Sequence, residues 1–238
     1  MSGPGPKTAM VLAAGLGTRL RPLTNDRPKA LVEVGGRPLI DHMLDRLAGV
    51  GVETAVVNVH WFADMLEQHL SGREQPRILI SDERAMLMET GGGLRRASKL
   101  LGPDPVWVAN IDSVWTQNSD GMADLAHAWD PERMDVVLML AQREASIGFE
   151  GQGDFFMQPD GRLAFRGDAP SAPYAYMGVH ITRPGIVADE PRGPFSLTRV
   201  WRRLAEQGRV YGRVLDGFWM HVGDPASRAE AEARLARA

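Results

Sequence analysis

The strongest constraint on the fold of this chain is the alternation of short apolar segments with amphipathic segments through residue 142. Apolar segments of strand length occupy residues 8–14, 54–60, 77–83, 105–112 and 135–142. Segments with helical periodicity lie between them, at residues 38–50, 61–70, 91–101 and 124–130. This order predicts an α/β fold of the Rossmann-like kind, with a mostly parallel central sheet and helices on both faces.

The pattern changes after Arg143. Two apolar runs flank Pro159-Asp160-Gly161, which predicts a hairpin over residues 153–165. A strand, a helix and two short strands are expected next, at residues 173–184, 196–208, 209–215 and 218–223. A last helix over residues 224–238 begins at Asp224, with Pro225 in its first position. We therefore predict one domain over residues 1–238, with a small β-rich portion in its C-terminal half and a loose leader at residues 2–6.

The composition excludes several classes of protein. The 238 residues carry a net charge of −3 and contain no run of lysine or arginine, so a nucleic-acid partner is not expected. The absence of cysteine excludes disulfides, thiolate metal sites and cysteine nucleophiles. The six histidines have no H-E-x-x-H spacing, and the G-x-S-x-G motif of serine hydrolases is absent.

The N-terminal segment only superficially resembles a signal peptide. The apolar run at residues 9–16 is short, has no convincing cleavage site and leads directly into Arg19 and Arg21. No segment approaches the roughly 20 apolar residues needed to span a bilayer. We expect a cytoplasmic protein without a membrane partner, and a monomer is slightly favoured.

Each early strand is followed by polar or glycine-rich sequence. Ligands of open α/β sheets bind at the carboxyl ends of the strands, so these segments together predict a binding site. The residues concerned are Gly15 to Arg19 after the first strand, Asn58 and His60 after the second, Asp82, Glu83 and residues 89–93 after the third, and Asn110 and Asp112 after the fourth.

The glycines after the first strand suit a phosphate-binding turn, because bare backbone N–H groups can approach phosphate oxygens closely. The loop lacks the spacing of a Walker motif, and Leu20 stands where a dinucleotide fingerprint has its third glycine. Arg19 and Lys29 could supply charge to phosphates, whereas Arg21 could equally be a surface charge. Asp112 either caps the next element or binds a hard cation such as Mg²⁺.

The segments "MVLAAGLGTRLRPLT" and "RPKALVEVGGRPLI" closely resemble the signature of the sugar-1-phosphate nucleotidylyltransferases. The resemblance continues through "ETGGG", "NID", "GDF", "YMGVHI" and "FWMHVG". Within the family, the short chain and "METGGGL" are most similar to N-acetylmuramate-1-phosphate uridylyltransferases, which make a nucleotide sugar for the cell wall. The resemblance implies that residues 8–142 bind nucleotide, that residues 143–223 bind sugar and that residues 224–238 form a C-terminal helix.

The resemblance also implies a role for individual residues. Arg19, Lys29 and Asp112 would be catalytic, and Asp112 and His221 would bind Mg²⁺, with Mn²⁺ as an alternative. Asp154 and Gly178 would face the sugar. The nucleotide, with UTP favoured, would be bound by Leu12, Ala13, Ala14, Gly15, Gly17, Thr18, Arg19, Glu89, Thr90, Gly91, Gly92 and Asn110.

The implied reaction is an in-line displacement at the α-phosphorus of the nucleoside triphosphate by an oxygen of the sugar 1-phosphate. Two positions depart from the family pattern. Ile111 replaces the glycine that usually precedes the metal-binding aspartate, and His221 replaces the second metal-binding aspartate. Imidazole is neutral and softer than carboxylate, so His221 would hold Mg²⁺ less firmly.

Two further interpretations remain open at this point. Another sugar-1-phosphate transferase, acting on guanylyl or thymidylyl groups, would share the same motifs. A non-catalytic sensor of nucleotide sugars would explain the changes at Ile111 and His221, although it would have less need of both Arg19 and Lys29. A dinucleotide-dependent dehydrogenase is the most distant interpretation, because its third glycine is missing.

Overall fold

The computed structural model describes residues 5–237 of the chain. Residues 2–4 of the expected leader lie outside the described residues. Within the leader, the carbonyl of Pro6 accepts a hydrogen bond of 3.2 Å from the Trp107 indole.

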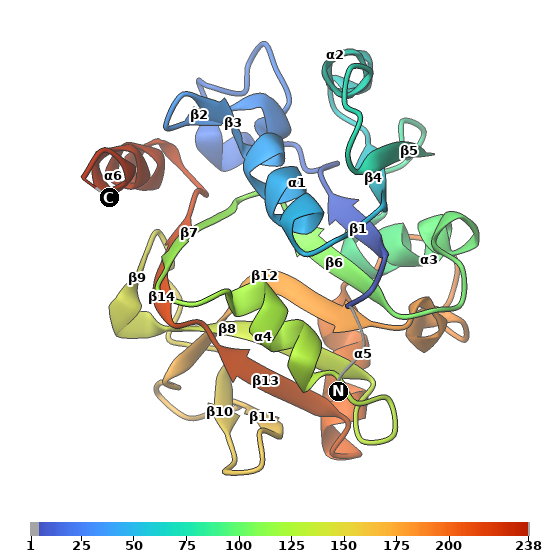
Figure 1. The fold of residues 1–238 in the computed structure, drawn as a ribbon, viewed down its shortest axis with the longest axis vertical. Coiled ribbons are helices and arrows are strands. Elements are labelled where there is room, and N and C mark those ends of the chain that lie inside the picture. Colours follow the sequence, from blue (N-terminus) through green and yellow to red (C-terminus); the bar gives the residue numbers. More distant parts are fainter. Residues whose placement is uncertain (1–4, 238) are drawn as a thin grey trace.

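A sheet of nine strands forms the centre of the molecule (Figure 1). Seven strands lie in the order β11-β10-β12-β6-β1-β4-β5, while β8 pairs with β12, and β13 pairs with β8. The neighbours β6, β1, β4 and β5 are parallel, as are β8 and β13. The bounds are β1 Thr8–Leu12, β4 Thr54–Val59, β5 Arg77–Asp82, β6 Val106–Asn110, β8 Val136–Gln142, β10 Phe155–Met157, β11 Leu163–Phe165, β12 Tyr174–Thr182 and β13 Val210–Val214.

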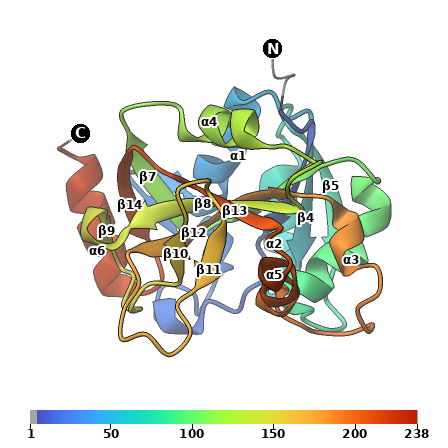
Figure 2. The same ribbon diagram turned by 90° about the horizontal axis from the view of Figure 1, so that it is seen from below.

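Helices cover both faces of this sheet, because the central strands are apolar on both sides. In β1, Ala9 and Val11 belong to one buried cluster and Met10 belongs to the other. Figures 1 and 2 show α1 and α4 on one face and α3 and α5 on the opposite face. The helices are α1 Leu39–Gly49, α2 Ala63–Leu70, α3 Glu89–Leu101, α4 Gly121–Ala128, α5 Leu197–Glu206 and α6 Pro225–Leu235. The α/β class with a mostly parallel sheet is therefore confirmed.

β12 interrupts the parallel arrangement of the central sheet. β12 comes from the C-terminal half of the chain, yet it lies between β6 and β8 and is antiparallel to both. The predicted hairpin is present as β10 and β11, and β10 pairs with the first residue of β12. Strands from both halves of the chain therefore share one sheet.

A second sheet was not expected from the sequence. It has the order β7-β14-β9, and its strands are β7 Ser113–Gln117, β14 Gly217–His221 and β9 Ser146–Ile147. A small hairpin of β2 Glu33–Val34 and β3 Arg37–Pro38 was also unexpected. The second sheet pairs β14 with β7, which directly follows the end of β6.

The last helix, α6, begins as predicted. Asp224 accepts a hydrogen bond from the Ser227 backbone in a capping box, and Pro225 is the first helical residue. Across residues 5–237, every helix falls short of the length and apolar character that a membrane crossing requires.

Candidate active site at the switch point of the sheet

The polar strand ends meet where the strand order of the sheet reverses. The chain runs from β1 outwards to β4 and β5 and then returns to β6 on the other side of β1. This reversal leaves a crevice outside the carboxyl ends of β1 and β6, where Leu12 is in register with Asn110. A pocket of about 250 Å³ opens there, lined by Leu12, Ala13, Ala14, Gly15, Lys29, Asn58, Leu87, Glu89, Thr90, Asn110, Ile111 and Asp112.

Gly15 and Gly17, the two glycines of the first loop, have different structural roles. Gly17 adopts the left-handed region at φ 63°, and a Cβ on it would lie 2.9 Å from the Thr24 methyl group. The Thr24 hydroxyl donates a hydrogen bond of 2.8 Å to the Gly17 carbonyl, which closes the turn. Gly15 lines the pocket, and a Cβ on it would meet nothing within 4 Å. The missing side chain of Gly15 therefore leaves space in the pocket, and it is not needed to avoid a clash with another residue.

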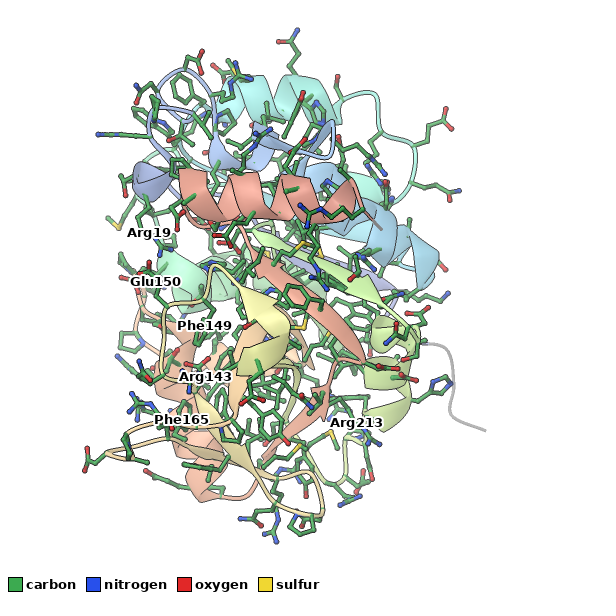
Figure 3. The ribbon with its side chains drawn as sticks, turned by 90° about the vertical axis from the view of Figure 1, so that its left-hand side faces the viewer. Arg19, Arg143, Phe149, Glu150, Phe165 and Arg213 are labelled. Atoms are coloured by element: carbon green, nitrogen blue, oxygen red, sulfur yellow. The ribbon has the colours of Figure 1, made fainter. Side chains whose placement is uncertain are left out.

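Arg19 lies exposed in the short 3₁₀ turn Thr18–Leu20. Its guanidinium carbon would be 3.6 Å from a Cβ on Gly223, so the side chain reaches the connection between β14 and α6. Hydrogen bonds from Ser227, together with the Arg19 charge, lower the pKa of neighbouring Asp224. Figure 3 shows Arg19 and Glu150 along the same edge of the molecule, with Arg19 nearer α6. Arg19 is thus placed at the rim of the site.

Lys29, Asp112 and His221 meet at one point. The Lys29 Nζ atom is 2.6 Å from Oδ2 of Asp112, and the His221 Nε2 atom is 3.4 Å from the same oxygen. Burial by itself would raise the pKa of Asp112, but Lys29 and His221 outweigh it and hold that pKa far below its usual range. We therefore expect the carboxyl group to be ionised.

Backbone pairing brings His221 to this point from far along the chain. His221 is the last residue of β14 and is in register with Ser113, the residue after Asp112. The Val222 N–H donates a hydrogen bond of 2.9 Å to the Asp112 carbonyl. The His221 Nδ1 atom lies 3.0 Å from the Gly148 carbonyl, to which it can donate only if it carries the proton. With Nδ1 protonated, Nε2 donates towards Asp112 when the ring is charged, and it has a free lone pair only when the ring is neutral.

Glu89 and Thr90 line the pocket as expected, but Gly91 and Gly92 do not. A Cβ on Gly91 would lie 2.3 Å from the Phe195 ring, and one on Gly92 would lie 2.5 Å from the Gly193 carbonyl. Both N–H groups donate to the Phe195 carbonyl, at 2.8 and 3.1 Å. The resemblance implied that Gly91 and Gly92 bind nucleotide; in the structure they instead make room for the segment at residues 193–195.

Gly178 lies next to the first pocket through Asn110. It has φ 85°, and a Cβ on it would lie 3.0 Å from the Asn110 Cβ. The pairing of β12 with β8 shifts register between Tyr176 and His180, so Gly178 lies in an irregular stretch of the strand. Gly178 therefore sets the position of Asn110, which lines the pocket.

Asp154 lines a second pocket, of about 350 Å³, between the β10–β11 hairpin and α5. Its Oδ2 atom accepts a hydrogen bond of 2.8 Å from the Tyr176 N–H. Burial raises the pKa of Asp154, opposed by the Tyr176 N–H and the Arg166 charge. The Arg166 guanidinium is held by the carbonyls of Gly153 and Ala169, at 3.0 and 2.6 Å. Figure 3 shows Phe165, which also lines this pocket, on the same side of the molecule as Arg19.

Comparison with known proteins agrees with this arrangement. The family model for nucleotidyl transferases matches residues 8–149. This chain belongs to the nucleotidyl transferase family. It is 60% identical to the N-acetylmuramate α-1-phosphate uridylyltransferase of Caulobacter vibrioides, over 98% of each chain. It is 33% identical to the protein of that name from Neisseria meningitidis serogroup B, over 94% of this chain and 96% of that one.

A solved structure shows the same fold. The inositol-1-phosphate CTP transferase from T. maritima superposes with a TM-score of 0.79, covering 99% of this chain and 98% of that one at 17% identity. The family resemblance read from the glycine loop and from "RPKALVEV" is therefore confirmed, together with the fold that it implied.

The donor set of this nucleotidyl transferase fits a divalent cation that the substrate helps to hold. The His221 Nε2 atom and the Asp112 Oδ2 atom lie 3.4 Å apart, so an imidazole nitrogen and a carboxylate oxygen are adjacent. Within residues 5–237, no three histidine, aspartate or glutamate side chains gather closely enough to hold a metal ion by themselves. A cation here would therefore need further ligands, and phosphate oxygens of a nucleotide are of the kind that Mg²⁺ prefers.

Asn58, Leu87 and Ile111 also line the pocket, and the sequence did not predict a binding role for them. In the sequence Asn58 is recognisable only as a polar residue at the end of a strand, and Ile111 only as a departure from the family pattern. Leu87 carried no signal, because an apolar residue in a loop does not distinguish a pocket wall from ordinary packing.

Proposed function

We propose that this protein transfers the uridylyl group of UTP to N-acetylmuramate 1-phosphate, giving UDP-N-acetylmuramate and pyrophosphate. The observation that carries the proposal is the 60% identity, over 98% of both chains, to the Caulobacter vibrioides enzyme of that activity. The convergence of the glycine loop, Lys29 and Asp112 on one pocket supports it. Such an enzyme would supply nucleotide sugar for the cell wall and would work in the cytoplasm, where UTP is made.

The chemistry requires positioning and charge neutralisation. An oxygen of the sugar phosphate forms a bond to the α-phosphorus of UTP, while the bond from that phosphorus to the pyrophosphate oxygen breaks. The nucleophile is already an anion, so no general base is needed. Lys29, beside Asp112, would bridge the α-phosphate and the incoming sugar phosphate, and exposed Arg19 would stabilise the departing pyrophosphate.

Asp112 and His221 would hold the divalent cation, Mg²⁺ or Mn²⁺. When bound, the cation supplies positive charge to the phosphates. The pair offers one carboxylate and one neutral imidazole, so we expect the cation to enter largely with the nucleotide. Lys29 keeps Asp112 ionised and compensated before that happens.

The nucleotide would occupy the first pocket and the sugar the second. Leu12 to Gly15, Glu89, Thr90 and Asn110 line the first pocket, while the turn of Gly17 and Thr18 lies beside Arg19. N-acetylmuramate carries a carboxylate on its lactyl ether. Arg166 and Arg202 both line the second pocket with Asp154, which suits a sugar that has both hydroxyl groups and a negative charge.

In terms of the chain, residues 8–142 would form most of the nucleotide site and residues 143–223 most of the sugar site. His221 is the exception, because it comes from the second segment and reaches the phosphate region. Residues 224–238 would support this arrangement through α6, whose first turn adjoins Arg19.

The test is pyrophosphate release across ATP, GTP, CTP, UTP and dTTP, each combined with several sugar 1-phosphates, in Mg²⁺ and in Mn²⁺. UTP with N-acetylmuramate 1-phosphate should give the highest kcat/KM. A preference for GTP or dTTP with another sugar would instead establish a guanylyl- or thymidylyltransferase. Binding of nucleotide sugar without turnover across the whole panel would establish a sensor.

A further inference from the structure

Glu83 is a buried carboxylate that the proposed reaction does not use. It directly follows β5 and is 0% exposed. Its Oε1 atom accepts a hydrogen bond of 2.9 Å from the Asn58 amide, and its Oε2 atom accepts one of 3.1 Å from the Met88 N–H. Both donors are neutral, and burial raises the pKa of Glu83 against the effect of these bonds. Burying a carboxylate in this way is costly, so the group is expected to have a specific task.

Asn58 connects Glu83 to the glycine loop. It is 3% exposed and lies on β4, beside β1. Its Oδ1 atom accepts hydrogen bonds of 2.6 Å from the Ala13 N–H and 3.2 Å from the Ala14 N–H. The orientation of the amide is determined by these partners, because a flipped amide would place its NH₂ group against two backbone donors.

Met88 connects Glu83 to the opposite wall of the pocket. Met88 lies between Leu87 and Glu89, which both line that pocket, and Glu89 has the rare backbone angle φ 59°. Gly93 leaves room for the pair: a Cβ on it would lie 3.0 Å from Glu83 Oε1 and 3.2 Å from the Asn58 amide nitrogen. The Glu83–Asn58 pair therefore joins the backbone of both walls beneath the nucleotide site.

We infer that Glu83 and Asn58 are positioning residues that set the distance between the two walls of the nucleotide pocket. This inference rests on the proposed function for its substrate. The pair acts through the backbone of Ala13, Ala14 and Met88, so it governs binding of the nucleoside triphosphate rather than binding of the sugar phosphate. Glu83 suits this task because a carboxylate accepts from both Asn58 and Met88 and presents no donor to either.

The experiment exchanges the carboxylate of Glu83 and the amide of Asn58, first one at a time and then together. Glu83→Gln presents an NH₂ group either to the Asn58 amide or to the Met88 N–H, so one buried donor loses its acceptor. Asn58→Asp places one carboxylate against another. Each single variant should raise the KM for the nucleotide on the order of tenfold, because Glu83→Gln leaves a buried donor unsatisfied and Asn58→Asp sets two buried acceptors against each other. The KM for the sugar 1-phosphate should change less than threefold.

The double variant Asn58→Asp/Glu83→Gln restores every hydrogen bond. The new carboxylate at position 58 can accept from Ala13, from Ala14 and from the new amide at position 83, whose carbonyl accepts from Met88. The nucleotide KM of the double variant should return to within about threefold of the wild-type value. Asp64→Asn is the matched control, because Asp64 is a carboxylate on α2 that is 97% exposed and binds Arg84. It should leave both KM values unchanged.

Dissociation constants measured for UTP alone test the role of the Glu83–Asn58 pair without relying on the proposed reaction. If the protein binds UTP but does not turn over, the same pattern across the variants should appear in UTP affinity. Should UTP not bind, the nucleotide selected by the panel replaces it. A double variant no better than the worse single variant would overturn the inference. Equal increases in both KM values would overturn it too, as would lower melting temperatures without any change in nucleotide affinity.

Discussion

At the scale of single residues, the site is organised around the charge of Asp112. Its carboxylate is ionised because Lys29 and His221 flank it, and the pKa of His221 is raised in turn by Asp112 against the effect of burial. Lys29 is largely buried, with a side chain 11% exposed, whereas Arg19 is exposed. Removing the Lys29 side chain would therefore take a partner from the Asp112 carboxylate, whereas removing the Arg19 side chain would affect only an exposed position.

Lys29→Ala should lower kcat/KM by about 10²-fold, the scale of losing one charge partner of a transition state. It should also lower the melting temperature, since Asp112 then keeps only His221 as a partner. Arg19→Ala should lower kcat/KM similarly without a change in melting temperature. Lys99→Ala, at an exposed lysine of α3, is the control. Steady-state kinetics and thermal melts check this, and near-normal kinetics in Lys29→Ala would remove Lys29 from the mechanism.

His221→Asp should keep turnover and tighten binding of Mg²⁺ to the free protein, because a second carboxylate suits a hard cation. Wild-type protein should favour Mn²⁺ more than the variant does, because Mn²⁺ accepts nitrogen ligands more readily. Without metal, two adjacent carboxylates should lower the melting temperature of the variant, and Mg²⁺ should restore it. Asp112→Asn should nearly abolish turnover. Identical metal dependence in wild type and His221→Asp would show that His221 is no ligand.

At the scale of elements, β12 and α5 are joined by an aromatic cluster under the second pocket. His180 on β12 is 1% exposed, and its Nδ1 atom lies 2.7 Å from the Tyr176 hydroxyl. Its ring packs edge to face against Trp201 on α5, with the ring centroids 5.1 Å apart. Among the described residues, the His180 Nε2 atom has no hydrogen-bond partner. Protonation of this ring would bury an uncompensated charge.

The stability of the protein should therefore fall as the pH falls. Burial lowers the pKa of His180 from 6.5 to about 3. Between these values the unfolded chain binds a proton that the folded chain does not, which costs about 1.4 kcal/mol per pH unit. His180→Asn should remove this contribution, so its stability should fall less steeply below pH 6.5.

Urea unfolding at pH 7.5, 6.5 and 5.5 measures the effect, with exposed His127→Asn as the control. The difference between wild type and His180→Asn should shrink with each step towards acid. A constant difference across the three pH values would show that His180 binds protons equally in the folded and unfolded states, contrary to this expectation.

At the scale of the whole molecule, one sheet combines both halves of the chain. β12 supplies partners to β6 and to β8, and β13 lies on the other side of β8. We therefore predict that unfolding is a single transition by circular dichroism and by tryptophan fluorescence, because the six tryptophans include residues of both halves, such as Trp107 and Trp201. A fragment of residues 1–142 should not unfold cooperatively, because β6 and β8 lose these partners. Two separate transitions in the full chain would contradict this prediction.

The sequence alone was sufficient for the α/β class, the principal strands and helices, the glycine loop and the family. Each of these depends on local chemistry: apolar periodicity for β1 and α1, a proline after a cap for α6, and a contiguous motif around Gly15 and Lys29. The polar ends of β4, β5 and β6 also predicted a site at one edge of the sheet, because parallel strands end on the same side.

Only the tertiary structure decided which distant residues meet. β7 has no strong local signal, yet its pairing with β14 brings His221 to 3.4 Å from Asp112. The insertion of β12 between β6 and β8, the packing of Gly91 under Phe195 and the Glu83–Asn58 pair all join segments far apart in the chain. Such contacts depend on the register of strands and the path of the whole backbone, and neither is encoded within a short window of sequence.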